Sequence, residues 1–344
     1  MGSINRNMLA TMSMTSAGFV VVALFFFLAI GQPPLKTLAD MVLFAVGDSY
    51  SLSETLLKTA PILLCALAAA VPGRLGLISV GAEGQLHVGA IFGTAVVLVM
   101  GGLNAWALIP LMIFAAVAGG GLFGFVPGYL RARLEINETI STLVLNYVGI
   151  LLVSALVYGP WRDPVNLGWP ATAPFPPSAV LPALGGSRVH LGLVLGLMLA
   201  VALHFAFTRG RWALSIRVLA GNRKVGETYG LDYGRQVVAL MALGGAIAGI
   251  AGIVEVSAVQ GRLQPGISVG YGLTGFLVAW LSGHRPLVIV PVSVVVAGLI
   301  SAGDALQLFA KVPAASVVIL QGLLFATALA VPGLWKRFGK SHGN

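Results

Sequence analysis

A carboxylate and an amide lie among glycines in the segment Ile78–Ala90, between two long apolar runs. These side chains belong to Glu83 and Gln85. A charged group within apolar surroundings is costly, so its presence is by default a hypothesis of function. A carboxylate is also favoured near the N-terminus of a helix, where it could cap the helix that follows. Both a functional contact and structural capping therefore remain open for Glu83.

The opening of this segment occurs a second time far downstream. Both Ile78-Ser-Val-Gly and Ile267-Ser-Val-Gly continue through glycine-rich polar residues into an apolar run. Two unrelated glycine-rich helix starts could produce the same match. The meaning of the repeat therefore depends on where the two copies lie in the fold.

The chain lacks the residue patterns of a catalytic or metal site. Its five histidines show no ligand spacing with one another or with Cys65. Gly339-Lys340-Ser341 resembles the end of a phosphate-binding loop, but Leu334 stands where that motif requires glycine. We expect no catalytic residue, no metal and no cofactor, and no nucleotide hydrolysis by this chain itself.

The elements that must position these residues are apolar helices. The sequence is 58% hydrophobic and 9% charged, whereas soluble domains carry roughly 25% charged residues. A spanning helix needs about 20 mostly apolar residues. We predict an all-α polytopic membrane protein, one domain over 1–344, with about ten spans near residues 17–31, 54–71, 86–101, 106–128, 138–158, 191–208, 236–256, 269–281, 287–301 and 314–331.

Three further expectations concern the first span and the segments between spans. The first apolar run could be a signal peptide, but Gln32-Pro-Pro offers no small-residue cleavage site, which favours a retained helix. A short interfacial helix is expected near 38–46. The stretch 159–190, rich in proline and aromatic residues, is expected to form an ordered external loop.

Basic residues are distributed unevenly between the predicted loops. When loops are assigned alternately to the two sides, most of the 20 lysines and arginines share the side of both termini. This bias predicts cytoplasmic termini. Ten spans divide into five and five, so the second half (about 190–331) would be inverted relative to the first (about 17–158). Each Ile-Ser-Val-Gly copy precedes the third span of its half, as inverted repeats with interrupted helices would require.

Ionisable residues at membrane depth are few: Lys58, Glu83, Glu255 and Asp304. Glu255 and Asp304 are expected near the outer interface, where they could be simply solvated. A carrier coupled to protons or sodium would usually contain more acidic residues in its spans. Their scarcity favours an energy source outside this chain.

The most charged stretch is the cytoplasmic loop 209–235. Residues between Gly221 and Gly230 are compatible with two helical turns lying along the membrane surface. Such a helix could dock a partner protein. Anionic lipid headgroups would also attract a basic loop, and this alternative stays open.

Several stretches taken together resemble one family. The loop Arg217–Asp232 resembles a coupling helix, and Gly81-Ala-Glu-Gly-Gln85 resembles a Gly-x-Glu-Gly-Gln signature. These features are similar to those of ATP-binding-cassette importer permeases for branched-chain amino acids, ribose and nucleosides. Three further stretches resemble the nucleoside and simple-sugar branch, namely Asn137–Tyr147, Gly159-Pro-Trp-Arg-Asp-Pro164 and Gly266–Ala279.

The sequence departs from this family at four positions. Ser79 stands where the branch usually has asparagine, and Ala220 replaces a usual glycine. Val225 and Gly226 replace a usual pair of alanines. These changes leave the partner ATPase and the substrate open.

The resemblance implies a permease subunit of a bacterial ATP-driven importer in the cytoplasmic (inner) membrane, transporting nucleosides. The implied partners are cytoplasmic ATPase subunits, a second homologous permease, an extracytoplasmic binding protein and membrane lipid, without nucleic acid. The residues expected along the substrate pathway are Glu83, Gln85, Ser268, Tyr271 and Thr274. Those expected to couple to the ATPase are Arg217, Gly221, Asn222, Arg223, Lys224, Glu227 and Gly230.

Three alternatives remain. The first is a ribose-type simple-sugar importer of the same family. The second is an ion-coupled secondary carrier that works alone, and the third is a structural membrane assembly factor.

Overall fold

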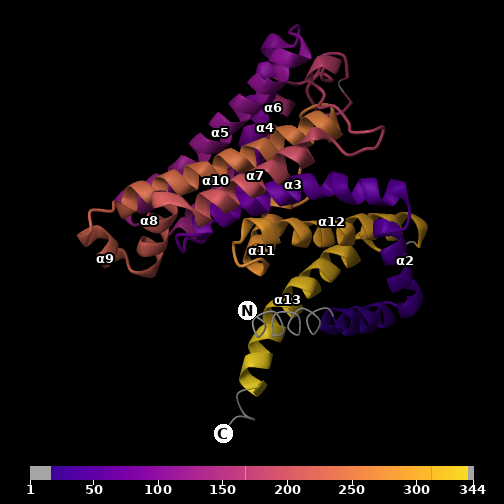
Figure 1. Ribbon diagram of the computed structural model, residues 1–344. Coiled ribbons are helices and arrows are strands. Elements are labelled where there is room, and N and C mark those ends of the chain that lie inside the picture. Colours follow the sequence, from indigo (N-terminus) through magenta and orange to yellow (C-terminus); the bar gives the residue numbers. More distant parts are fainter. Residues whose placement is uncertain (1–16, 167, 311, 340–344) are drawn as a thin grey trace. The chain divides into compact units, whose positions relative to one another are not determined.

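The computed structural model describes residues 17–166, 168–310 and 312–339 (Figure 1). Regular structure in these ranges is helical, apart from one isolated antiparallel bridge between Ala183 and His190. The helices are Ala17–Ala29, α2 (Pro34–Val46), α3 (Ser49–Gly73), α4 (Ala82–Met100), α5 (Ala105–Leu134), α6 (Glu138–Tyr158), η1 (Pro177–Ala179), α7 (Leu191–Thr208), α8 (Gly210–Gly221), α9 (Arg223–Thr228), α10 (Tyr233–Glu255), η2 (Val256–Gln260), α11 (Tyr271–Leu281), α12 (Pro286–Phe309) and α13 (Ala314–Gly339).

The prediction of an all-helical membrane protein is confirmed. Within the described ranges, seven helices are long and apolar enough to cross a membrane, or eight if the bent pair Ala17–Ala29 and Pro34–Val46 forms one span. A helix lies at each of the ten predicted positions. Two of them, Tyr271–Leu281 and the apolar part Ala315–Ala330 of α13, are shorter than a full span.

One predicted boundary was wrong. The third predicted span begins at Ala82 rather than near residue 86, so Glu83 and Gln85 lie in the first turns of α4. The surface helix predicted between Gly221 and Gly230 is present as α9, and a separate helix, α8, precedes it. The break lies at Asn222, whose side chain accepts a hydrogen bond from the Val225 amide. Asparagine is a preferred N-cap residue because it offers this bond.

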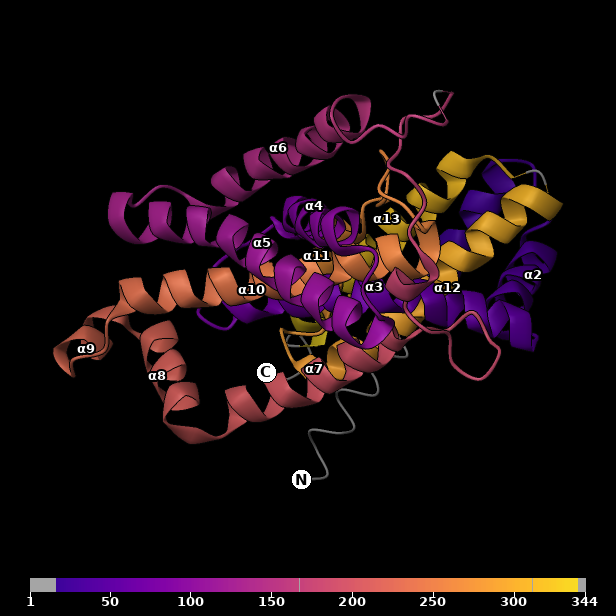
Figure 2. The same ribbon diagram turned by 90° about the horizontal axis from the view of Figure 1, so that it is seen from above.

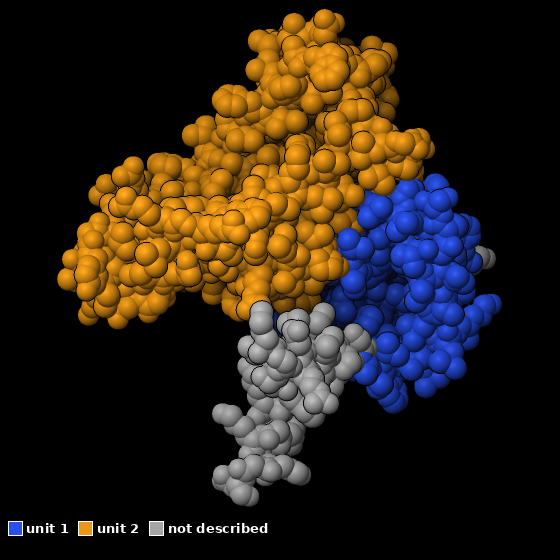
Figure 3. Space-filling view, viewed as in Figure 1, with its two compact units in different colours: residues 1–56, 294–344 blue, residues 57–293 orange. Residues whose placement is uncertain are grey.

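The described chain forms two compact units (Figure 3), and these do not coincide with the two halves of the sequence. The first unit contains the beginning and the end of the chain, up to Leu56 and from Val294. Its core is apolar, and Phe44 stacks on Phe309 at 5.6 Å between ring centroids. The buried residues of this core are Ala23, Phe27, Met41, Leu299, Ala302, Leu306, Val312 and Leu320.

The second unit, Leu57–Ser293, is built around α4, α5 and α10. Glycines bring these helices into backbone contact. A methyl group on Gly89 would collide with the backbone of Gly249, and one on Gly245 would collide with the backbone of Gly120. Small residues that permit such close approach drive helix packing where lipid provides no hydrophobic force between helices.

Within this unit, α10 joins two different surfaces (Figures 1 and 2). The short helices α8 and α9 lie at the start of α10, and the loop 159–190 lies at its far end. Hydrogen bonds attach that loop to the turn after α10, from the Leu181 amide to the Ser257 hydroxyl and from the Phe175 amide to the Gly261 carbonyl. The two surfaces are therefore separated by the length of a spanning helix.

Candidate functional site

The two Ile-Ser-Val-Gly segments lead into helices whose N-termini meet. The Glu83 carboxylate, in the first turn of α4, accepts a hydrogen bond from the Gly272 amide in the first turn of α11 at 2.6 Å. The Ser268 hydroxyl accepts from the Gly270 and Tyr271 amides at 3.2 and 3.0 Å. Two side chains thus satisfy amide groups at the start of α11 that have no partner within the helix.

This arrangement decides which helix Glu83 caps. The carboxylate was expected either to contact a functional pathway or to cap the helix that follows it in the sequence. Its hydrogen bond instead reaches α11, far away in the sequence. The positive ends of two helix dipoles therefore converge on one buried carboxylate.

The five predicted pathway residues gather at or near this junction. Glu83, Gln85, Tyr271 and Thr274 are buried, whereas Ser268 is half-buried. The junction is closely packed, because a methyl group on Gly272 would collide with the backbone of Glu83.

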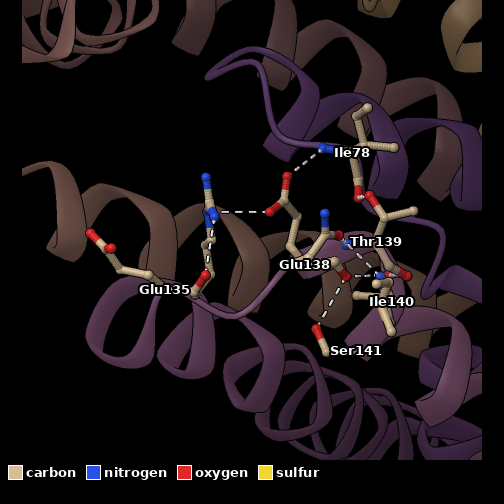
Figure 4. A network of polar contacts seen from close by, with 9 residues as sticks. Ile78, Glu135, Glu138, Thr139, Ile140 and Ser141 are labelled. Atoms are coloured by element: carbon tan, nitrogen blue, oxygen red, sulfur yellow. Dashed lines mark hydrogen bonds and ion pairs between the residues drawn. The ribbon is translucent and has the colours of Figure 1, made fainter.

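A row of polar side chains on α6 holds the extended segment before α4, and sequence reasoning missed it (Figure 4). The Glu138 carboxylate accepts from the Ile78 amide at 3.2 Å and pairs with the Arg131 guanidinium, also at 3.2 Å. The Thr139 hydroxyl donates to the Ile78 carbonyl at 3.0 Å. The start of the segment is therefore anchored to the first turn of α6.

The same row continues one and two turns further along α6. The Thr142 hydroxyl accepts from the Val80 amide at 3.2 Å. The Asn146 side chain donates to the Val80 carbonyl and accepts from the Gly84 amide, each at 2.8 Å. Irregular backbone at membrane depth is tolerated only where protein or water satisfies it, and α6 supplies these partners.

A signal for this row was present in the sequence. Glu138, Thr142 and Asn146 recur every four residues in an otherwise apolar helix, so they share one face. The spacing predicts a polar stripe facing protein. It does not say that the partner is the segment carrying Glu83.

The predicted coupling residues lie on α8, on α9 and in the turns that flank α9. All seven are exposed. Arg223 pairs with Glu227 at 2.8 Å, and its guanidinium lies 4.6 Å from the centre of the Tyr233 ring. Gly230 has a φ of +79°, a backbone conformation that favours glycine. Lys224 is therefore a better candidate than Arg223 for contact with a partner, because Arg223 already has intramolecular contacts.

Arg74, Arg217 and Arg285 lie near one another at the end of the unit that carries α8 and α9, so their positive charges repel. Burial lowers the pKa of the Arg74 guanidinium, and the nearby charges of Arg217 and Arg285 lower it further. The same guanidinium lies 5.5 Å from the centre of the Phe207 ring. Arg217 was predicted as a coupling residue; Arg74 and Arg285 were not, because only the fold brings them near it.

A mostly apolar hollow of about 1070 Å³ opens at the opposite end, beside the loop 159–190. Its lining includes Trp106, Ile109, Leu181, Arg188 and His190. His190 is buried, and burial lowers its pKa to about 4. Its Nδ1 accepts from the Gly192 amide, so the neutral ring carries its proton on Nε2. Apolar walls with a few polar groups are typical of small-molecule sites.

In residues 17–166, 168–310 and 312–339, no three His, Cys, Asp or Glu side chains lie close enough together to hold a metal ion.

Comparison with known proteins decides the family. Residues 51–329 match the model of the branched-chain amino acid transport system / permease component family. The chain belongs to this permease family. Its relatives include the glucose ABC transporter permease TsgB13 of Haloferax volcanii, 31% identical over 86% of this chain and 80% of the relative.

Two further relatives of this permease carry names that refer to nucleosides. The guanosine ABC transporter permease NupP of Bacillus subtilis is 31% identical over 74% of this chain and 73% of its own length. The nucleoside ABC transporter permease NupB of Lactococcus lactis is 27% identical over 83% of this chain and 81% of its own length. The family resemblance that was drawn from sequence motifs is thereby confirmed.

Proposed function

We propose that this permease imports nucleosides as the transmembrane subunit of an ATP-driven transporter. The observation that carries this proposal is the match of residues 51–329 to the permease family, together with nucleoside names among the relatives. A simple sugar is the second candidate, because the relative TsgB13 is named as a glucose permease.

The proposed assembly contains separate ATPase subunits, a binding protein and a second permease. NupP and NupQ are both relatives from Bacillus subtilis, and TsgB13 and TsgC13 are both from Haloferax volcanii. Two different permeases in one organism support a heterodimer. The protein would reside in the bacterial cytoplasmic membrane, with ten helices crossing or entering it and both termini in the cytoplasm.

The proposed mechanism assigns different roles to the two ends of α10. ATPase closure would push on α8 and α9, where Lys224 on α9 and Tyr229 directly after it are exposed. The push would move α10 and the helices packed on it through glycine contacts, because backbones in direct contact cannot slide independently. The Glu83 junction would open as α4 and α11 separate, exposing polar groups to a neutral solute.

Uptake by the reconstituted importer tests this function. The permease, with the ATPases and binding protein encoded beside it, is placed in vesicles and offered radiolabelled guanosine, uridine or glucose. We expect nucleoside uptake that requires ATP. Uptake of glucose alone would select the sugar alternative, and uptake driven by an ion gradient without ATP would establish a secondary carrier.

A further inference from the structure

A second buried carboxylate, at the opposite end of α10 from the coupling helices, is connected to the protein surface by side chains. Glu255 is the last residue of α10 and only 2% exposed. One of its oxygens, Oε2, has no hydrogen-bond partner within the described residues. Buried polar atoms are nearly always paired, so an unpaired carboxylate oxygen requires an explanation.

The other oxygen begins a chain of hydrogen bonds that leads outward. Gln260 Nε2 donates to Glu255 Oε1 at 3.3 Å, and Gln264 Nε2 donates to Gln260 Oε1 at 2.7 Å. The Trp169 indole donates to Gln264 Oε1 at 3.1 Å. Trp169 is 56% exposed, so the chain joins a surface aromatic ring to the buried acid.

A local distortion of the helix makes this chain possible. Residues Val256–Gln260 form a π-helical turn, in which hydrogen bonds join residues five apart. Glu255 and Gln260 are five apart, so the turn brings both side chains to one side. In a continuous α-helix they would point about 140° apart. Single π-turns within helices frequently occur at functional sites.

Other contacts already hold the surrounding loop in place. The Thr172 amide donates to the Leu263 carbonyl, and the Leu263 amide donates to the Thr172 hydroxyl. Ser257 donates to the Ala179 carbonyl at 2.6 Å. The loop is attached by these bonds, so attachment does not account for the glutamine chain or for the unpaired oxygen.

We propose that Glu255, Gln260, Gln264 and Trp169 form an entry subsite for a neutral solute with neighbouring hydroxyl groups, a class that includes nucleosides and sugars. This inference rests on the proposed function. Solute hydroxyls donate to Glu255 Oε2, and the two glutamine amides exchange their mutual bonds for bonds to the solute. The exposed face of the Trp169 ring stacks on a base or sugar ring, as aromatic side chains do with the flat faces of bases.

Uptake by the complete reconstituted importer, with uridine and glucose as probes, tests the subsite. Glu255→Gln keeps an acceptor for Gln260 but replaces the unpaired oxygen Oε2 by an amide nitrogen, which cannot accept a hydrogen bond. We expect uptake to fall about tenfold or more, because the solute loses this acceptor. Assembly with the ATPases is measured beside uptake, so that uptake is compared at equal amounts of the complete importer. Trp169→Ala should reduce uridine uptake more than glucose uptake if the base stacks there.

Cysteine labelling tests contact with the solute directly. Cys65 is buried, so a charged thiol reagent should react with a cysteine introduced near the surface and not with the native thiol. Gln264→Cys should be labelled, and uridine should slow the labelling. The control is Val165→Cys, on the loop that carries Trp169 and 91% exposed, whose labelling uridine should leave unchanged.

The outcomes separate two failures. If the wild-type importer takes up neither uridine nor glucose, both the proposed function and the proposed subsite are wrong. If wild-type uptake is normal, Glu255→Gln transports equally well and uridine fails to protect Gln264→Cys, only the subsite is wrong.

Discussion

Gly272 determines how closely α11 can approach α4. Any side chain at this position would collide with the backbone of Glu83, whose carboxylate also accepts the Gly272 amide. A residue with no side chain is therefore required at the junction.

Gly272→Ala should destabilise the protein by about 1–3 kcal/mol, the usual cost of overpacking. Thermal unfolding of the purified protein in detergent measures the loss. Gly322→Ala is the matched control in a helix, because no atom lies within 4 Å of the added methyl group. Equal unfolding temperatures of the two variants would contradict the prediction, because they would show that α4 and α11 can move apart without loss of stability.

His190 should make stability depend on pH. Its pKa is about 4 in the folded protein, against 6.5 ordinarily. The unfolded chain therefore binds more protons between these values, and stability should fall as pH drops from about 6.5 towards 4. His190→Asn offers an acceptor to Gly192 without titrating. Unfolding temperatures across this range should fall less in the variant; parallel curves would contradict the prediction.

Among the elements, α6 acts as the support for an extended segment. Asn146 alone bonds to backbone groups of both Val80 and Gly84. This support is what allows α4 to begin at Ala82, beside the N-terminus of α11.

Asn146→Leu should cost about 2 kcal/mol or more, since it leaves two buried backbone groups unpaired. Asn146→Asp keeps the acceptor for Gly84 and should lose less. Thermal unfolding again provides the measurement. Ser154→Ala serves as the control, because the Ser154 hydroxyl bonds only within α6. A stable Asn146→Leu protein would mean that water can replace the side chain.

The second element with a testable role is α9. Charge reversal at Lys224 should weaken ATPase binding, measured by co-purification at matched expression. Arg223→Glu would also break the pair with Glu227 and place like charges four residues apart. The exchange Arg223→Glu with Glu227→Arg restores that pair and serves as its control. Unchanged ATPase binding by Lys224→Glu would remove that residue from the coupling surface.

For the whole molecule, the main prediction is the identity of the second permease. Relatives occur as pairs of different permeases in single organisms. Purification of a tagged copy from native membranes should therefore recover a homologous but different permease with the ATPases. Recovery of an untagged copy of this same chain, coexpressed as a control, would instead indicate a homodimer.

The sequence alone determined the class, the helix positions and the family. Long apolar runs, low charge and short motifs are local properties, and lipid requires each spanning backbone to satisfy itself as a helix. The apolar pattern therefore located a helix at each predicted position without knowledge of its neighbours. The exact first residues of α4 and α9 were harder to predict from the apolar pattern, because glycines and an asparagine cap determine them.

Only the tertiary structure decided which partners the polar residues have. The sequence pattern left Glu83 as a cap of the helix that follows or as a pathway residue, whereas its hydrogen-bond partner Gly272 lies 189 residues away. Likewise, the stripe on α6 was readable, whereas its attachment to Ile78 and Val80 was not. Hydrogen bonds between distant segments depend on how helices pack, and packing here depends on glycine contacts that local patterns do not specify.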